Sequence, residues 1–290
     1  MGQLVTVACD RYDAPRISEA VRNACEALGV ALPTQGQGFL HPACPWVHPA
    51  FAPASFTHLA VIEGVAGALR GMSLTIGTNS LPLFPTRYSY RKARYPALAR
   101  QLEARLVCLE EEDYRVAELP SAGREGRTFR LPRLLAAADF SVSLPKLTGS
   151  SYVCFAGAIR HRYSLLAQAD QLAEQHHLPE RLVDLISLAP FNLIVVDAIQ
   201  ATHMGGEVSG LPVDLGVLII GTDPLSVDLV CTGLYGLPPA HVDYLRLATE
   251  RGLVPRDIDQ VEVLGDLGLE ELRLRSRRHT WHRMTGSLRR

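Results

Sequence analysis

Three residues that can do acid–base chemistry come at or just after apolar runs in the second half of the chain: Lys146, Asp197 and Asp223. Such runs are typical of strands buried in a parallel sheet. If the three strands are parallel neighbours, their carboxyl ends meet at one edge of the sheet, where α/β proteins bind their ligands. An ammonium beside carboxylates can bind an anion or transfer a proton. We therefore expect Lys146, Asp197 and Asp223 to be catalytic.

Lys146 also stands out by composition. The chain has two lysines, Lys92 and Lys146, and otherwise carries its positive charge on arginine. A lysine kept in such a chain favours a site that needs a compact ammonium rather than a planar guanidinium. Two structural alternatives stay open: an ion pair that only ties strand ends together, and a helix cap at Asp223, which precedes Pro224.

The segments that follow these runs contain further groups that suit a small-molecule site. His203, after the run that ends at Asp197, is a fourth candidate for moving a proton. The candidate substrate-binding residues are Arg160, His161, Ser150, Gly205, Gly206 and His41. The glycine-rich loop 205–210 lacks the lysine of a phosphate-binding loop, and the chain has no G-x-G-x-x-G fingerprint, so nucleotide binding is not predicted.

The cysteines and histidines do not predict a metal site. The six cysteines are scattered singly, without a C-x-x-C pair or the spacing of an iron–sulfur or zinc site. His41, Cys44 and His48 stand at loose ligand spacing, and His58 or His203 could complete such a set, but loop histidines are usually exposed. We predict no metal and leave the cofactor unknown. Reduced thiols favour the cytoplasm.

The bulk composition is that of a soluble globular protein with a core. The chain has 290 residues, of which 47% are hydrophobic and 20% charged, and a formal net charge of −1. Such a charge provides no field that attracts nucleic acid or a membrane surface. No apolar run reaches the roughly 20 residues that span a bilayer, and no basic region precedes the first strand as in a signal peptide. We expect a small-molecule substrate, neither nucleic acid nor membrane as partner, and possible homo-oligomers.

Apolar segments with strand and helix periodicity alternate along the chain. This alternation predicts an α/β fold with a largely parallel sheet flanked by helices, possibly in two α/β lobes. Expected strands are 4–9, 39–42, 74–76, 106–109, 138–147, 191–197, 215–220 and 261–264. Expected helices begin near Asp13, Ser55 and Leu225 and cover parts of 88–102, 132–138, 152–166, 178–188 and 240–252.

The domain boundaries are predicted from composition. Residues 1–270 form a single α/β domain, with a possible subdivision near 110–131, where an acidic run and polar turns surround a short hairpin. Residues 271–290 are a basic tail without an acidic residue after Glu271. The tail is either frayed or a contact with an anionic partner or another subunit.

The second half of the chain resembles the family known as domain of unknown function 362. The matching segments are 138–147, 157–161, 194–199, the glycine loop 205–210 and 220–228. The first half agrees more loosely, at Cys9 and Tyr12 near the first strand, at 40–43, and at Thr57 and His58, which open a helix. The resemblance extends from about Val5 to Gly265, and it implies a fold and a site more than a reaction.

The chain departs from the family pattern at several polar positions. Members usually follow the proline–lysine with lysine, threonine and histidine, where this chain has Leu147, Thr148 and Gly149. A family lysine–asparagine pair is Arg160-His161 here, and a lysine–proline–asparagine is His41-Pro42-Ala43. Many members also carry a C-terminal ferredoxin-like module, and this sequence has none. The resemblance thus implies a member with a shifted substrate or lost chemistry.

Three functions are compatible with these residues. In the first, an enzyme of isomerase, racemase or lyase type holds a small anionic or carbonyl-containing metabolite on Lys146 and Arg160. Asp197, Asp223 or His203 would then move a proton. The second is a non-catalytic ligand-binding or accessory protein. The third is a redox protein that takes electrons from an external ferredoxin.

Overall fold

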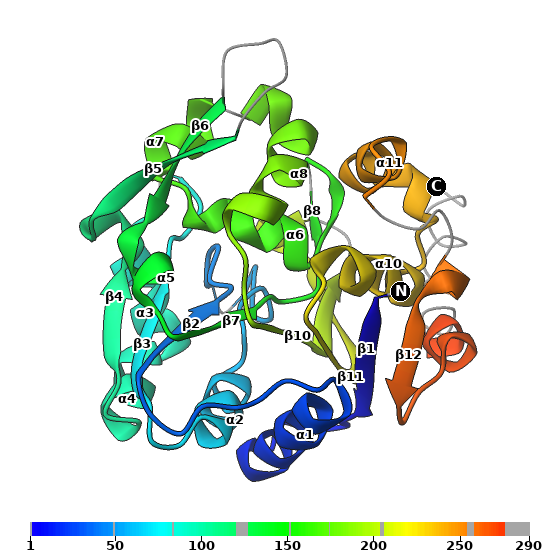
Figure 1. The fold of residues 1–290 in the computed structure, drawn as a ribbon, viewed down its shortest axis with the longest axis horizontal. Coiled ribbons are helices and arrows are strands. Elements are labelled where there is room, and N and C mark those ends of the chain that lie inside the picture. Colours follow the sequence, from blue (N-terminus) through cyan, green and yellow to red (C-terminus); the bar gives the residue numbers. More distant parts are fainter. Residues whose placement is uncertain are drawn as a thin grey trace.

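A computed structural model shows an eight-stranded sheet with helices on both faces, which confirms the predicted α/β fold class (Figure 1). The structure describes residues 2–48, 50–82, 84–119, 127–150, 152–173, 175–203, 206–253 and 258–275. No helix within these residues is both long and apolar enough to cross a membrane.

The strand order in the large sheet is β12-β1-β11-β10-β7-β2-β3-β4. These strands are β1 (Gln3–Ala8), β2 (Gln37–Pro42), β3 (Ser73–Thr78), β4 (Arg105–Cys108), β7 (Phe140–Leu144), β10 (Leu193–His203), β11 (Leu211–Gly221) and β12 (Glu262–Gly265). Strands from β10 through β7, β2 and β3 to β4 pair in parallel, as β1 and β12 do, whereas β11 runs antiparallel to both of its neighbours. The sheet is therefore largely parallel, with β11 as its one reversed strand.

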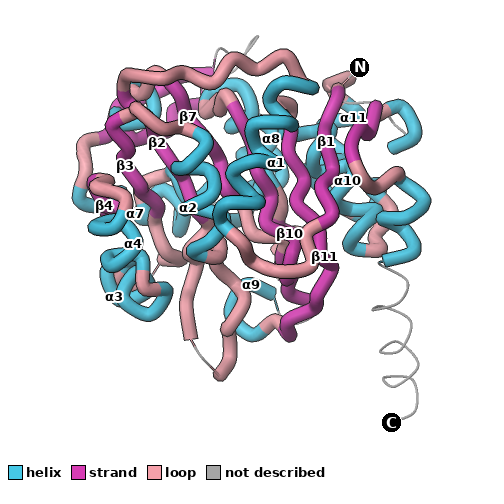
Figure 2. Tube along the Cα trace, turned by 90° about the horizontal axis from the view of Figure 1, so that it is seen from below, coloured by secondary structure: helices cyan, strands magenta, loops and turns pink. Residues whose placement is uncertain are grey.

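β10 and β11 are longer than the sequence predicts. The strand that begins at Leu193 continues past Asp197 to His203. The aspartate therefore lies inside β10 and not at its end. β11 pairs with β10 over nearly its whole length, from Gly221 opposite Ile194 to Leu211 opposite His203. The two strands project beyond the sheet toward the short helix α9 (Gly206–Ser209), as Figure 2 shows.

The remaining helices cover the two faces of the sheet (Figure 1). They are α1 (Ala14–Ala27), α2 (Leu59–Ala68), α3 (Thr86–Ala93), α4 (Tyr95–Gln101), α5 (Arg133–Ala137), α6 (Ala158–His161), α7 (Gln168–Ala173), α8 (Leu178–Leu188), α10 (Pro224–Tyr235) and α11 (Asp243–Glu250). Short 3₁₀ turns are η1 (Leu109–Glu111), η2 (Arg162–Leu165), η3 (Gln175–His177), η4 (Pro239–His241) and η5 (Ile258–Gln260). α1 begins as predicted, with Asp13 accepting from the Arg16 amide and Pro15 in the first turn.

The buried apolar side chains form two clusters, one on each face of the sheet. One joins α1, α2 and α4 to the strands through residues such as Ile17, Val61 and Leu98. The other joins α6, α8, α10 and α11, with Ile159 and Leu182 among its members. Both faces of the central strands are thus covered, which explains why β10 is apolar at successive positions instead of alternate ones.

Two local predictions differ from the structure. The segment 152–166, expected to be one helix, is divided into β9 (Cys154–Ala156), α6 and η2, and β9 pairs with β8 (Thr148–Ser150). Cys154 has a φ of 63°, which ends any regular helix there. The helix expected to begin at Ser55 begins at Leu59, with His58 as its cap.

The hairpin expected within 110–131 is present as β5 (Tyr114–Leu119) and β6 (Arg127–Pro132), which pair antiparallel. The acidic run before it makes ion pairs, Arg87 with Glu111 and Arg105 with Glu112. Most of the predicted basic tail, 276–290, lies outside the described residues. Before it, Arg275 donates to the carbonyl oxygens of Leu215 and Gly216.

A candidate active site at the carboxyl edge of the sheet

The direction of the strands brings several polar segments to one edge of the sheet. β1, β3, β7 and β10 all run the same way. Tyr12 follows β1, Asn79 follows β3, and Lys146 follows β7. This is the edge at which open α/β sheets bind ligands.

The backbone places Lys146 directly beside Asp197. β7 ends at Leu144 and Pro145, and the chain then pairs once more with β10 in a parallel bridge between Lys146 and Asp197. The Asp197 amide donates to the Pro145 carbonyl at 2.8 Å, and the Leu147 amide donates to the Asp197 carbonyl at 3.1 Å. Because residues in register on neighbouring strands point to the same face, the ammonium and the carboxylate meet.

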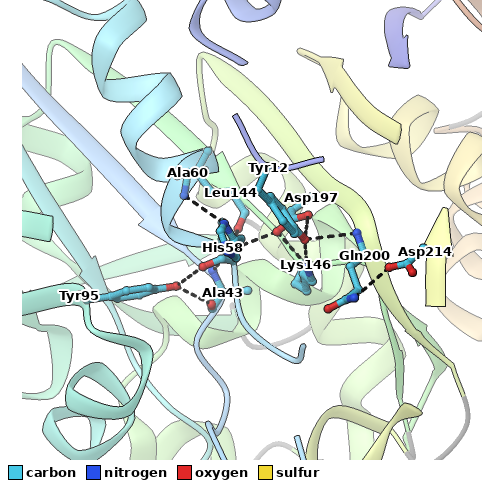
Figure 3. Close-up of polar contacts among 11 residues, drawn as sticks. Tyr12, Ala43, His58, Ala60, Tyr95, Leu144, Lys146, Asp197, Gln200 and Asp214 are labelled. Carbon is cyan, nitrogen blue, oxygen red and sulfur yellow. Dashed lines mark hydrogen bonds and ion pairs between the residues drawn. The ribbon is translucent and has the colours of Figure 1, made fainter. Parts of the chain in front are cut away.

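Lys146, Asp197 and Tyr12 form a closed triangle of hydrogen bonds (Figure 3). Lys146 Nζ donates to Asp197 Oδ2 and to Tyr12 Oη, both at 2.8 Å, and Tyr12 Oη donates to Asp197 Oδ1 at 3.0 Å. Two backbone amides complete it: Gln200 N donates to Tyr12 Oη, and His58 N donates to Asp197 Oδ2. The register of β10 shifts between Ala198 and Gln200, a bulge of the kind found beside active sites.

The ammonium and the carboxylate of this triangle are almost fully shielded from water, whereas Tyr12 is half-buried. The Lys146 side chain is 2% exposed and the Asp197 side chain 0%. Burial lowers the pKa of Lys146, and the attraction of Asp197 opposes that shift. Burial and the nearby Asp197 charge raise the pKa of Tyr12 far above its usual value, so Tyr12 keeps its proton. His58 stacks on Tyr12 with 3.7 Å between ring centroids, and burial lowers the pKa of His58.

Lys146 also lines a cavity of about 50 Å³. This volume holds a few solvent molecules or a small organic ion, since one water needs roughly 10–15 Å³. The polar residues that line it include Lys146, Asn79, Arg160, His161, Ser164 and Glu207. The cavity therefore combines three formal charges, one imidazole and neutral donors and acceptors.

Three buried polar atoms of the cavity wall have no hydrogen-bond partner among the described residues: Arg160 Nε, Glu207 Oε1 and Asn79 Oδ1. Arg160 and Glu207 are 8% and 7% exposed, and Asn79 is 1% exposed. Arg160 Nη2 lies 3.7 Å from Glu207 Oε1, which is an ion pair but too long for a hydrogen bond. Because buried polar groups in proteins are nearly always paired, these atoms indicate that a polar molecule belongs in the cavity.

Asp228 of α10 holds the helix that carries Arg160 and His161. Its carboxylate accepts from the amides of Ala158 and Ile159 at 2.6 and 3.0 Å and from Tyr244 Oη at 2.9 Å. Burial raises the pKa of Asp228 to about 6, against the lowering effect of these bonds. A Cβ at Gly157 would collide with this carboxylate, which explains the glycine before α6.

The hydrogen bonds of His161 fix which ring nitrogen carries its proton. His161 Nε2 lies 2.9 Å from the His41 carbonyl oxygen, which can only accept, so Nε2 is protonated. Burial, with His41 and Arg162 nearby, lowers the pKa of His161 well below its usual value, so the ring is neutral. His161 Nδ1 is then an unprotonated lone pair, and no described residue donates to it.

His41 and Ser164 contact His161 and hold it in place. The His41 ring stacks on His161 at 4.2 Å between centroids, and its Nδ1 donates to the Gly77 carbonyl at 2.8 Å. Burial lowers the pKa of His41 to about 4. The Ser164 hydroxyl lies 3.0 Å from His41 Nε2 and 2.7 Å from the His161 carbonyl, and its proton can go to either.

Asp223 does not lie with Lys146 and Asp197. It was expected there on the assumption that its strand runs parallel to its neighbours, but β11 is reversed and ends opposite Ile194, near the start of β10. Asp223 therefore sits at the other edge of the sheet. There it caps α10, with Oδ1 and Oδ2 accepting from the amides of Leu225 and Ser226, the structural alternative considered above.

The other predicted residues divide between the cavity and its surroundings. Arg160 and His161 line the cavity, and His41 lies against His161. His203 ends β10, with its ring 5.3 Å from that of Tyr235, and it is not part of the described cavity wall. Ser150 ends β8, where its hydroxyl accepts from the Tyr152 amide. Gly206 begins α9 with a φ of 67° and precedes Glu207, and Gly205 lies outside the described residues.

Four residues of the site were not predicted: Tyr12, Asn79, Ser164 and Glu207. Tyr12 was noted in the resemblance without a role, and His58 was noted there and as a possible addition to a loose metal-ligand set. Within the described residues, no three His, Cys, Asp or Glu side chains gather closely enough to hold a metal ion. His48 instead stacks on Phe51.

The model of one protein family, described as "Domain of unknown function (DUF362)", matches residues 40–233. The chain belongs to this family. The matched range of this DUF362 protein includes Lys146, Asp197, Arg160 and Glu207, whereas Tyr12 precedes it. No curated protein matches the chain.

The DUF362 chain is also similar to a solved structure, that of the lactate racemase apoprotein from Thermoanaerobacterium thermosaccharolyticum. The two share 10% sequence identity with a TM-score of 0.42. The similarity covers 82% of this chain and 58% of the other, so this chain spans less than two thirds of that protein's length. A likeness at this level carries no inference about substrate or activity.

Proposed function

We propose that this DUF362 protein is an enzyme that binds a small anionic or carbonyl-containing metabolite and transfers a proton, as an isomerase, racemase or lyase does. The observation that carries the proposal is the cavity in which the unpaired Arg160 Nε and the neutral imidazole of His161 come together. A buried guanidinium whose Nε–H has no acceptor favours an anionic group of the substrate.

Arg160 and Lys146 are the groups that hold the anion in this proposal. Arg160 offers Nε–H, and Lys146 gives two of its three N–H bonds to Asp197 and Tyr12, so that one N–H remains for a ligand. Negative charge that develops on a carbonyl or carboxylate oxygen would be stabilised by donors already fixed in place. Asp197 then acts by orienting the ammonium, since both of its oxygens accept hydrogen bonds from protein groups.

His161 is the proton-transfer group that this geometry favours, in place of Asp223 and His203. Its Nδ1 is unprotonated and needs no prior loss of a proton to act as a base. A bound anion beside the ring favours the imidazolium and so raises the proton affinity of Nδ1. The chemistry requires a substrate hydrogen within hydrogen-bond reach of Nδ1.

Hydrogen exchange tests the proposal directly. The protein is incubated in D₂O with small 2-hydroxy, 2-amino and 2-oxo acids. Proton NMR follows loss of the signal of the C2 hydrogen in the hydroxy and amino acids, and of the C3 hydrogens next to the carbonyl in the oxo acids. We expect exchange with at least one compound, abolished in His161→Asn and at least tenfold slower in Lys146→Met. Lys92→Met is the matched control, because Lys92 is exposed and outside the cavity wall. Exchange that persists unchanged in folded His161→Asn contradicts the proposal.

A non-catalytic binding protein is the second candidate, and the closed triangle around Lys146 favours it. An ammonium that is 2% exposed and already bonded to Asp197 and Tyr12 serves binding and rigidity as well as catalysis. Binding of a compound without any exchange of its hydrogens supports this candidate against the enzyme.

We also place the protein in the cytoplasm. All six cysteines are free thiols, and five of them are buried, whereas Cys154 is exposed. Unpaired thiols are typical of a reducing compartment. Labelled antibodies or fractionation of the cells that make the protein test this placement.

A further inference from the structure

We propose that the ligand of this cavity carries a protonated amine as well as a carboxylate, so that it is a small α-amino acid. The inference rests on the proposed function for the location of the site, because it concerns the same cavity. It goes further by naming the class of molecule that the unpaired atoms of the wall require.

The charges at the cavity are balanced before a ligand enters. Lys146 is paired with Asp197, and Arg160 lies beside Glu207, so these four described groups sum to zero. His161 adds no charge while its ring is neutral. A simple anion would leave one negative charge uncompensated beside side chains that are at most 8% exposed, which is unfavourable. A zwitterion adds no net charge and offers an opposite group to both Arg160 and Glu207.

The unpaired acceptors of the cavity wall give an independent reason to expect an ammonium group on the ligand. Asn79 Nδ2 donates to the Leu166 carbonyl at 3.0 Å, and since that oxygen can only accept, the orientation of the amide is fixed and Oδ1 is the unpaired atom. Glu207 Oε1 is a second buried acceptor, which has the Arg160 ion pair but no hydrogen-bond donor among the described residues. A carboxylate has no donor for these two oxygens and a hydroxyl has one, whereas an ammonium has three.

The complementary arrangement follows from these atoms. The ligand carboxylate lies on Arg160 Nε, and the ligand ammonium lies between Glu207 Oε1 and Asn79 Oδ1. The cavity of about 50 Å³ restricts the side chain to a small one. Alanine and lactate have nearly the same shape, but alanine carries an ammonium where lactate carries a hydroxyl. A comparison of their affinities therefore measures the contribution of the ammonium alone.

Isothermal titration calorimetry with both enantiomers of alanine and of lactate tests the inference. We expect one enantiomer of alanine to bind about tenfold or more tightly than either lactate, because a hydroxyl leaves a buried acceptor unpaired. In Glu207→Gln this preference should fall about tenfold. Glu26→Gln is the matched control, since Glu26 is an exposed residue of α1, and it should leave the preference intact. Circular dichroism and thermal unfolding confirm that both variants fold.

Each outcome decides between the two proposals. Lactate that binds as tightly as alanine, or a preference for alanine that survives Glu207→Gln, overturns the amine inference. Exchange of the lactate hydrogen in D₂O without alanine binding also overturns it while proton transfer stands. Alanine binding without exchange supports the amine inference and contradicts the enzyme. No binding of any of the four compounds overturns the amine inference.

Discussion

Lys146 Nζ donates a 2.8 Å hydrogen bond to Tyr12 Oη, although the two residues are 134 positions apart in the chain. Tyr12 follows β1 and Lys146 follows β7, and two other strands, β11 and β10, separate these strands in the sheet. The contact is possible because β1 runs in the same direction as β7: β11 is antiparallel to both β1 and β10, and β10 is parallel to β7. The chain after β1 therefore emerges at the same edge as the chain after β7. The phenol and Asp197 together hold the ammonium in one orientation.

Replacing Lys146 by methionine should destabilise the fold as well as weaken ligand binding. The substitution leaves Asp197 buried without its cation, and removing one partner of a buried ion pair costs about 3–5 kcal/mol. Denaturation by urea measures the free energy of unfolding. Lys92→Met, at the exposed lysine, is expected to change it by less than about 0.5 kcal/mol.

A double substitution separates the buried charge from other effects of Lys146→Met. Adding Asp197→Asn removes the uncompensated carboxylate, so the double variant should be less destabilised than the sum of the two single variants. Additive effects would show that Lys146 and Asp197 do not stabilise each other.

Replacing Tyr12 by phenylalanine should destabilise the protein by about 1–3 kcal/mol, because it removes a buried hydroxyl that both donates and accepts. Lys146 and the Gln200 amide lose their acceptor, and Asp197 loses a donor. Ligand affinity should fall as well, since the ammonium is then held by one partner. Urea denaturation and calorimetry measure the two effects. Tyr152→Phe, at a side chain that is 57% exposed, should alter neither.

The apolar runs predicted most strands, and through them the pairing of Lys146 with Asp197. The position of Asp223 was wrong for a traceable reason. With expected strands at 191–197 and 215–220, the connection between them is long enough for a parallel crossover, which needs a dozen or more residues. β10 in fact reaches His203 and β11 begins at Leu211, so only a hairpin connection fits.

Other parts of the site were missed for different reasons. Asn79 comes just after the expected strand 74–76, so it carried the same signal as Lys146 and could have been found. Glu207 lies in a short segment between two strands, and neither periodicity nor spacing predicts that this segment meets the cavity. Tyr12 lies between β1 and α1, where a single tyrosine has no pattern of its own. The strands could be predicted because burial shapes their composition, whereas the loops converge only through the order of the strands.

The stability of the protein should fall in mild acid through His41. Burial lowers the pKa of His41 from 6.5 to about 4, so the unfolded chain binds a proton in this range that the folded protein does not. The contribution of His41 is present above about pH 6.5 and is lost as the pH falls through 4, about 3 kcal/mol in all.

The substitution His41→Asn, which keeps a donor for the Gly77 carbonyl, tests this pH dependence. The free energy of unfolding of wild type minus that of the variant should shrink by about 3 kcal/mol between pH 7 and pH 4. His161 titrates in both proteins, so most of its effect cancels. The same substitution at His241, whose side chain is exposed, is the control. If the difference in unfolding free energy between wild type and His41→Asn stays constant with pH, protonation of His41 does not contribute to the loss of stability in acid.

Two aspartates that bond to the amides at helix starts should differ sharply in their importance for the ligand. Asp228 holds the amides of Ala158 and Ile159, and Asp228→Asn replaces one acceptor oxygen by a donor that faces another donor. We expect a loss of about 2–3 kcal/mol in stability and weaker ligand binding, because the helix α6 carries Arg160 and His161.

Asp223→Asn makes the same change at the opposite edge of the sheet, where asparagine caps a helix about as well as aspartate. It should leave ligand binding unchanged, and a loss of binding there would restore Asp223 to the site.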